Sequence, residues 1–144
     1  MKNDNNQILK KGVAEVIIKE ELEKKINSKK KLRIKFGIDP TGSDLHLGHA
    51  VPLKKLRQFQ DRGDTAILLI GDYTARIGDP TGKSETRVML SEEKIKENMK
   101  HYIDQASKIL DLQKLEIRYN SEWFSKMTMG DILNLTSHKT ISQM

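Results

Sequence analysis

Cysteine is absent from the 144 residues, so the chain has no material for a disulfide framework or a thiolate metal site. Long apolar runs are missing too, and no segment approaches the roughly 20 residues that a membrane-spanning helix requires. The first residues, MKNDNNQILKKGVAEV, contain no uninterrupted apolar stretch of the kind found in signal peptides. These absences argue against secreted disulfide scaffolds and membrane proteins, and we expect a cytoplasmic protein with no membrane partner.

Internal repeats, low-complexity tracts and Pro/Gly/Ser-rich linkers are also lacking. The chain is 36% hydrophobic and 32% charged, and its length is suited to one domain. The net charge of +6 is concentrated in residues 1–31, which hold nine lysines against five acidic residues. Two interpretations of this segment stay open, a solvated lysine-rich helix and a surface that attracts RNA.

Hydrophobic periodicity predicts alternating helices and strands. Strands are predicted at 31–39, 65–72 and 115–120, and helices within 8–27, over 45–61, from Ser91 to Leu110 and from Thr128 onward. In the helix over 45–61, Leu47, Val51, Leu56 and Phe59 are expected on or near one apolar face, and Gly63 is the expected stop signal. Ser91 is the expected N-cap of its helix, and Thr128 with Asp131 is the expected capping box of the last one. The continuous apolar run TAILLI is typical of a strand that is covered on both faces. Helices of this length between strands imply a parallel sheet, so the expected fold class is α/β, a parallel sheet flanked by helices. The predicted division is an N-terminal helical segment, 1–31, and a ligand-binding domain over 32–144.

Polar, Gly/Asp-rich loops follow the first two predicted strands. Their sequences are GIDPTGSD and GDYTARIGDPTGK. Parallel α/β sheets bind ligands beyond the carboxyl ends of their strands. Both loops therefore lie where a ligand is expected.

Two of the four histidines flank Gly48 at the predicted start of the second helix. If Leu45 opens this helix, His46 and His49 lie one turn apart at its N-terminal end, where free backbone N–H groups and the helix dipole favour a phosphate. Gly48 would let a flat ligand lie against the backbone. Three alternatives stay open: surface histidines that cap the turn, two ligands of a metal with no third ligand nearby, or a core position for His46.

The loop GDPTGKS has some features of a phosphate-binding P-loop. That motif requires a glycine at position 77, where this chain has Ile77, and the nearest glycine, Gly78, comes one residue late. We therefore do not predict a P-loop. Glycines still allow close backbone approach, and Asp79 can pair with an ammonium group, so the loop stays a candidate ligand contact.

The two loops together carry a more specific resemblance. DPTGSDLHLGH resembles the H-x-G-H signature of class I aminoacyl-tRNA synthetases, and GDYTARIGDPTGKSETR resembles the corresponding block of bacterial tyrosyl-tRNA synthetases. The strand with Lys35 and the segment LRQFQDRG are similar to the second bacterial branch of that family. The resemblance runs from about Leu9 to Met144.

The resemblance implies a Rossmann-like catalytic domain, with N-terminal helices before it. In this family ATP, as its Mg²⁺ complex, and L-tyrosine form tyrosyl-adenylate with release of pyrophosphate. The tyrosyl group then passes to tRNA(Tyr), and the full-length enzymes are homodimers. No tightly bound cofactor and no metal-ligating residue are implied. The closest alternative is a tryptophanyl-tRNA synthetase. A non-catalytic nucleotide- or RNA-binding module and a P-loop NTPase are more distant ones.

The same resemblance assigns candidate roles to individual residues. The implied catalytic residues are His46 and His49. The implied ATP-binding residues are Asp39, Pro40, Thr41, Asp44, Leu45, His46, Leu47, Gly48, His49 and Pro52. The implied tyrosine-binding residues are Lys35, Gly37, Asp39, Thr74, Asp79 and Asn120, with Asp79 holding the α-ammonium group.

Three positions depart from the family or stay outside its site. Lys35 stands where many members have a tyrosine that bonds the substrate phenol. Pro52 stands where others often have threonine, in what we predict is the harmless first turn of the helix. We predict that Trp123 is a core residue.

The second family signature, a Lys-Met-Ser-Lys-Ser-like loop that clamps the triphosphate, is not found in this sequence. We therefore expect the chain to be the N-terminal half of a catalytic domain, with little or no aminoacylation activity when isolated.

Overall fold

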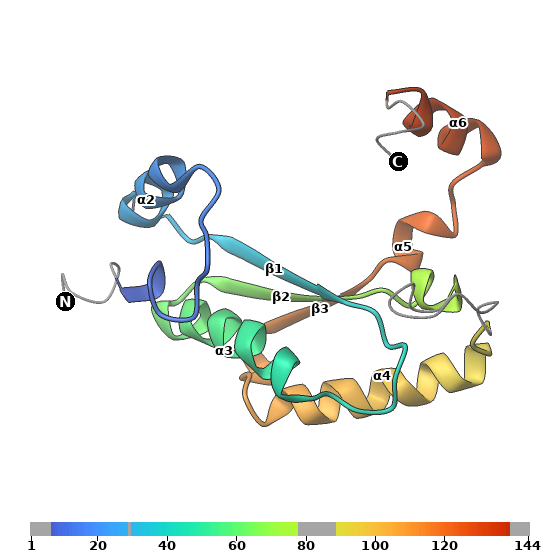
Figure 1. Ribbon diagram of the computed structural model, residues 1–144, viewed down its shortest axis with the longest axis horizontal. Coiled ribbons are helices and arrows are strands. Elements are labelled where there is room, and N and C mark those ends of the chain that lie inside the picture. Colours follow the sequence, from blue (N-terminus) through green and yellow to red (C-terminus); the bar gives the residue numbers. More distant parts are fainter. Residues whose placement is uncertain (1–6, 29, 78–88, 139–144) are drawn as a thin grey trace.

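A three-stranded parallel sheet organises the protein, as the computed structural model in Figure 1 shows. The structure describes residues 7–28, 30–77 and 89–138, so Asp79 and the rest of the loop 78–88 lie outside the described residues. In chain order the elements are α2 (Lys19–Asn27), β1 (Arg33–Ile38), α3 (Leu47–Arg62), β2 (Thr65–Ile70), the 3₁₀ helix η1 (Thr74–Ile77), α4 (Glu92–Ser107), the 3₁₀ helix η2 (Leu112–Lys114), β3 (Leu115–Tyr119), α5 (Ser121–Phe124) and α6 (Met129–Ser137). The predicted α/β class is confirmed.

The strands lie in the order β1-β2-β3, and both pairs are parallel. Their register places Phe36, Leu68 and Ile117 side by side across the sheet. Helices α3 and α4 connect successive strands, as parallel pairing requires. All three strands therefore end at the same edge, beyond which α5 and α6 lie in Figure 1.

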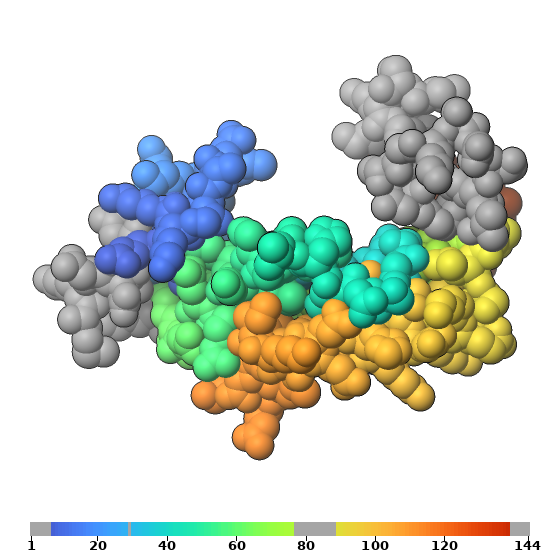
Figure 2. Space-filling view, turned by 60° about the horizontal axis from the view of Figure 1, so that its bottom comes forward, coloured from blue at the N-terminus to red at the C-terminus, as the bar shows by residue number. Residues whose placement is uncertain are grey.

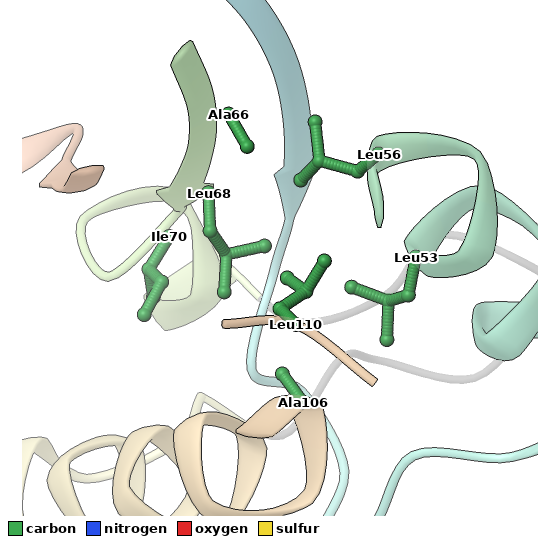
Figure 3. Close-up of a cluster of buried hydrophobic side chains, with 7 residues drawn as sticks. All are labelled: Leu53, Leu56, Ala66, Leu68, Ile70, Ala106 and Leu110. Carbon is green, nitrogen blue, oxygen red and sulfur yellow. The ribbon is translucent and has the colours of Figure 1, made fainter. Parts of the chain in front are cut away.

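The main core lies between the sheet and the helices α3 and α4 (Figure 3). Its central residues are Leu53 and Leu56 of α3, Ala66, Leu68 and Ile70 of β2, Ala106 of α4, and Leu110 just after it. Every second residue of β2 points into this cluster, which is the period expected of a strand with one buried face. Burial of these apolar side chains stabilises the position of both helices under the sheet.

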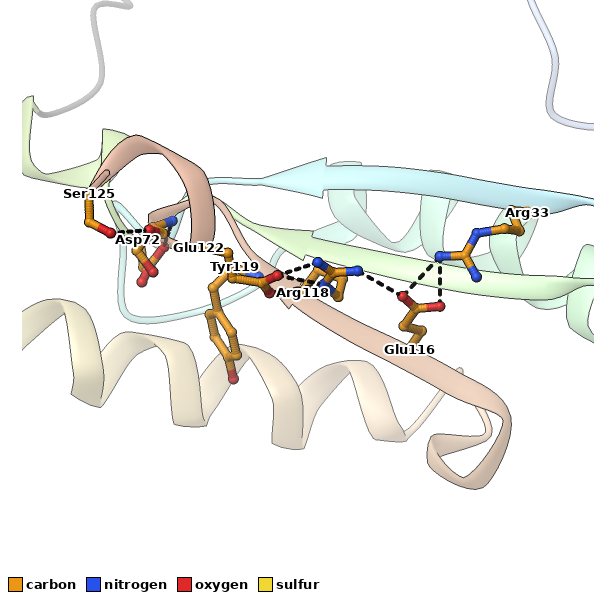
Figure 4. A network of polar contacts seen from close by, with 8 residues as sticks. Arg33, Asp72, Glu116, Arg118, Tyr119, Glu122 and Ser125 are labelled. Carbon is orange, nitrogen blue, oxygen red and sulfur yellow. Dashed lines mark hydrogen bonds and ion pairs between the residues drawn. The ribbon is translucent and has the colours of Figure 1, made fainter. Parts of the chain in front are cut away.

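The opposite face of the sheet carries charged side chains (Figure 4). Arg33 of β1 reaches across β2 to an oxygen of Glu116 at 2.9 Å, and Arg118 pairs with both Glu116 and Glu122. The residues of β2 on this face, including Ile67 and Leu69, are only half-buried. The prediction that β2 is covered on both faces is therefore wrong for the described part of the chain.

The N-terminal segment is less helical than predicted. In the described residues α2 begins only at Lys19, because Gly12 (φ 68°) and Ile18 (φ 55°) have left-handed backbone conformations that interrupt a helix. The segment is nevertheless attached to the body of the protein. Ile8 and Ile26 pack on Phe59 of α3 in a second small cluster.

Helix α3 begins and ends by local signals. It starts at Leu47 rather than at the predicted Leu45, and Gly63 (φ 95°) ends it as predicted. Leu47 is 87% and Val51 55% exposed, so their predicted place on the apolar face is wrong.

Pro52 is the sixth residue of α3, not in its first turn as predicted. Since proline has no N–H, the helical hydrogen bond from residue 52 to the carbonyl of Gly48 does not form. Proline in place of the threonine that is frequent at this position therefore removes one backbone hydrogen bond of α3 close to His46 and His49.

In the C-terminal part of the chain, the predicted helix cap is confirmed but the predicted burial of a side chain is wrong. Thr128 and Asp131 form the predicted capping box of α6. Trp123 is 40% exposed, so its prediction as a core residue is wrong. Within the described ranges, none of the helices is long and apolar enough to cross a membrane.

Candidate functional site

A chain of hydrogen bonds joins the three loops at the carboxyl edge of the sheet. The hydroxyl of Thr74, after β2, donates to Oδ1 of Asp39, after β1, at 3.0 Å. The Nδ2 of Asn120, after β3, donates to the same hydroxyl oxygen at 2.9 Å. Three residues that were predicted from separate loops as tyrosine contacts therefore lie together.

Asn120 is the most firmly held residue of this hydrogen-bond chain. It is 6% exposed, and its Oδ1 accepts a hydrogen bond from the backbone N–H of Tyr73 at 2.8 Å. Its own N–H donates to the carbonyl of Ile70 at 3.0 Å. Because the backbone donor sets the orientation of the amide, Nδ2 must face Thr74. The Thr74 hydroxyl proton is thereby directed away from Asn120, toward the Asp39 carboxylate at 3.0 Å and the Gly71 carbonyl at 3.3 Å.

Gly71 is a residue that the sequence prediction missed at this site. A Cβ atom at this position would lie 1.7 Å from Oδ1 of Asp39 and 2.6 Å from Oγ1 of Thr74. Only glycine leaves room for the carboxylate to approach the backbone here. The available signal was a glycine directly after the apolar run of the second strand, at the edge where ligands bind.

Lys35 and Gly37 lie on the open face of β1, on the same side as Asp39. The Nζ of Lys35 lies 3.3 Å from the position of a Cβ on Gly37, so the side chain extends along the strand toward its carboxyl end. The predicted tyrosine contacts Lys35, Gly37 and Asp39 thus form a row on one face. Asp79, predicted with them, is among the undescribed residues.

His46 and His49 hold each other at the N-terminus of α3. His46 is the N-cap residue, and its Nδ1 accepts from the Gly48 N–H at 3.1 Å. The Nδ1 of His49 accepts from the His46 N–H at 3.2 Å, and the ring centroids are 3.9 Å apart. The helix begins two residues later than predicted, but the reciprocal capping still brings the two imidazoles together.

This capping determines which ring nitrogens are free for a ligand. An Nδ1 that accepts a backbone N–H carries no proton, so the proton of a neutral ring is on Nε2. Burial, and secondly the charge of His46, lower the pKa of His49. The arrangement thus offers two Nε2–H donors beside the backbone N–H groups of the first helical turn, which suits an anion.

Gly48 is required by the position of the His46 ring. A Cβ at Gly48 would lie 2.8 Å from Cε1 and 2.9 Å from Nδ1 of His46. A side chain here would therefore displace the imidazole and its cap. Its predicted contact with a flat ligand stays a prediction.

The other predicted ATP contacts lie in or after the loop between β1 and α3. Pro40 is buried, and Thr41 donates its N–H to the carbonyl of Asp39 at 2.8 Å. Hydrogen bonds from Ser43 and Gln105 lower the pKa of Asp44. Leu45 packs on the main core.

An open groove of about 640 Å³ lies beside the histidines, between the start of α3 and the end of α4. It is lined by Asp44, Leu45, His46, Leu47, Ala50, Leu53, Gln105, Lys108 and Ile109. Of the predicted tyrosine contacts, none of the five that the structure describes lines it. Among the described residues there is no group of three His, Asp or Glu side chains that could hold a metal ion.

The neutral form of His49 predicts a pH dependence of stability. Because its pKa is lower in the folded protein, the unfolded chain binds more protons once the pH falls below about 6.5. The free energy of unfolding should therefore decrease from pH 8 to pH 5.5. The decrease should be smaller in His49→Gln, where glutamine can accept the cap hydrogen bond without titrating. Urea unfolding at both pH values tests this, and equal decreases in the two proteins would contradict it.

Comparison with known proteins shows which family this chain matches. The family described as tRNA synthetases class I (W and Y) matches residues 27–144. A protein of Thermotoga maritima named tyrosine–tRNA ligase is 54% identical over 138 residues, covering 96% of this chain and 34% of the relative. One of Dehalococcoides mccartyi with the same name is 51% identical over 142 residues, covering 99% and 36%. The chain thus spans about a third of the length of these relatives.

Solved structures with the same fold include enzymes for both amino acids. Tyrosyl-tRNA synthetase from Archaeoglobus fulgidus, complexed with L-tyrosine, superposes with a TM-score of 0.76 at 23% identity, covering 96% of this chain and 41% of that one. Tryptophanyl-tRNA synthetase from Plasmodium falciparum gives 0.61 at 16% identity, covering 100% and 44%. The fold therefore supports the Rossmann-like class I architecture and does not separate tyrosine from tryptophan.

Proposed function

Since the chain belongs to the class I tRNA synthetases for tryptophan and tyrosine, we propose that it forms the ATP- and tyrosine-binding part of a tyrosine–tRNA ligase. The observation that carries the proposal is that the loop after β1 connects two hydrogen-bonded groups of predicted ligand contacts. One is the histidine-capped N-terminus of α3, and the other is the Asp39–Thr74–Asn120 chain. The identity of about 50% to relatives named tyrosine–tRNA ligase favours tyrosine over tryptophan.

The start of α3 is the proposed phosphate site. The Nε2–H groups of His46 and His49, together with the positive end of the helix, can neutralise charge on the phosphate oxygens of ATP, which enters as its Mg²⁺ complex. The tyrosine carboxylate attacks the α-phosphorus in line, and pyrophosphate leaves. This step needs no nucleophile from the protein. The contribution of the chain is to align the reactants and stabilise the developing charge.

The open face of β1 is the proposed tyrosine site. Four residue steps lead from Lys35 to Asp39, about 13 Å of extended backbone, and the Lys35 side chain extends into this interval. We assign the amino-acid end of tyrosine to Asp39, Thr74 and Asn120, with Asp79, and the phenol end to Lys35. Transfer to tRNA(Tyr) and homodimer formation belong to the full-length enzyme in this proposal.

Binding of a non-hydrolysable tyrosyl-adenylate analogue, measured by calorimetry, tests the proposal. We expect saturable binding with at least tenfold preference over the tryptophanyl analogue. His46→Ala and His49→Ala should each weaken binding about tenfold or more, since a hydrogen bond to a charged group contributes roughly 1.5–3 kcal/mol. His138→Ala, at an exposed histidine after α6, is the control and should leave affinity unchanged.

Two results would contradict the proposal. A preference for the tryptophanyl analogue would make tryptophan the substrate, as in the other branch of the family. Binding that survives both histidine substitutions would place the phosphates elsewhere.

A further inference from the structure

One face of α4 holds the loop that leads from β1 to the histidines. Asn98, Tyr102 and Gln105 follow one another at spacings of four and three residues, so they share a face of the helix. Each contacts a different part of the loop 40–45, at Pro40, Gly42 and Asp44. In Figure 2 this turquoise part of the chain lies directly against the yellow and orange of α4.

Gln105 makes the closest of these contacts. Its Nε2 donates to Oδ1 of Asp44 at 2.6 Å, and its Oε1 accepts from the N–H of Leu45 at 2.7 Å. Leu45 directly precedes His46. Both ends of one amide thus restrain the backbone immediately before the cap of α3.

Asn98 and Tyr102 restrain the earlier part of the loop. Asn98 is 1% exposed and donates from Nδ2 to the carbonyl of Pro40 at 3.0 Å. Its Oδ1 has no hydrogen-bond partner within the described ranges, an energetic cost that an apolar side chain would avoid. The hydroxyl oxygen of the buried Tyr102 lies 3.6 Å from the position of a Cβ on Gly42, so the ring packs against this part of the loop.

We propose that Asn98, Tyr102 and Gln105 are positioning residues for ATP, with α4 acting as the template on which the loop 40–45 is ordered. The inference rests on the proposed function of the histidine pair. Ordering a residue costs backbone conformational entropy. When α4 has already ordered the loop, ATP binding does not have to order it and the affinity for ATP is higher. When these contacts are lost, ATP binding must order the loop and the affinity falls.

Gln105→Met tests the proposal, because methionine has a similar length and makes neither hydrogen bond. ATP and L-tyrosine affinities are measured separately by calorimetry. We expect the Kd for ATP to rise at least tenfold and the Kd for tyrosine to stay within twofold, since Asp39, Thr74 and Asn120 are held by their own hydrogen bonds. The control Gln113→Met removes an exposed glutamine of η2 and should change neither value.

A double substitution that exchanges the donor and the acceptor of the Gln105–Asp44 hydrogen bond tests whether ATP binding can be rescued. Gln105→Glu places a carboxylate against Asp44 and should weaken ATP binding more than tenfold at pH 8. Adding Asp44→Asn supplies an amide donor opposite that carboxylate, which still accepts from Leu45. The double variant should therefore bind ATP within threefold of Asp44→Asn alone, an outcome that general destabilisation does not produce.

The outcomes separate this proposal from the one on which it rests. If His46→Ala and His49→Ala weaken ATP binding but Gln105→Met does not, the positioning role is wrong and the proposed function stands. Equal losses of ATP and tyrosine affinity in Gln105→Met, or no rescue in the double variant, also overturn the positioning role. If the unmodified chain binds no ATP, both proposals are wrong.

Discussion

Gly71→Ala is expected to abolish binding of L-tyrosine, with a loss of affinity of at least a hundredfold. The new methyl group would occupy the position of the Asp39 carboxylate, 1.7 Å from Oδ1, and would also overlap the Thr74 hydroxyl. Asp39 and Thr74 must then move apart, which breaks the hydrogen-bonded chain to Asn120. Overpacking of this kind also destabilises the fold by roughly 1–3 kcal/mol. Calorimetry with L-tyrosine and urea unfolding measure the two effects.

Gly130→Ala is the matched control for this prediction. Gly130 lies within α6, and a Cβ there meets only Oγ1 of Thr128 at 3.6 Å, an ordinary contact. Alanine should leave tyrosine affinity unchanged and stabilise the helix slightly. Wild-type tyrosine affinity in Gly71→Ala would show that the carboxyl edge of the sheet is not the amino-acid site.

Arg62→Met is expected to reduce the free energy of unfolding by about 3–5 kcal/mol, the usual cost of leaving a buried charge without its partner. The partner is Asp64, whose side chain is 3% exposed and receives two hydrogen bonds from the guanidinium, at 2.6 and 2.9 Å. Asp64 also accepts from the N–H of Leu32, and Arg62 donates to the carbonyl of Ile26 at 3.0 Å. The pair therefore ties the end of α2 to the sheet.

Urea unfolding of this variant has two informative comparisons. Lys94→Met breaks an exposed ion pair with Glu97 and should cost less than about 1 kcal/mol. Asp64→Asn should lower the free energy of unfolding less than Arg62→Met does. The side chain of Arg62 is 19% exposed and can be solvated when its partner loses its charge, and the amide oxygen of the new asparagine can still accept from the N–H of Leu32. A loss below 1 kcal/mol in Arg62→Met would show that Asp64 is not held by this arginine.

Local sequence signals predicted the elements of this fold correctly where their cause is local. Ser91 caps α4 by accepting from the Lys94 N–H, Thr128 caps α6, and Gly63 ends α3 in a left-handed conformation. Caps and strand alternation depend on residues within a few positions of one another, so one short stretch contains the whole cause. The loop motifs likewise indicated the family, while ligand binding at the carboxyl edge stays a prediction.

Burial of individual side chains was predicted less well, because it depends on distant parts of the chain. Leu47, Val51 and Trp123 carry apolar side chains that suit a core, yet all three are at least 40% exposed in the described structure. Hydrophobicity shows that burial is favourable, but it does not identify which surface is available to cover a residue.

The sequence by itself determined the succession of strands and helices along the chain and the loops that carry the candidate site. Only the tertiary structure decided how those loops are held. Gly71 is constrained by Asp39, thirty-two positions away, and Gln105 of α4 restrains Leu45, sixty positions away. No spacing rule along the chain connects such pairs, since their contact is created when the sheet and its helices pack.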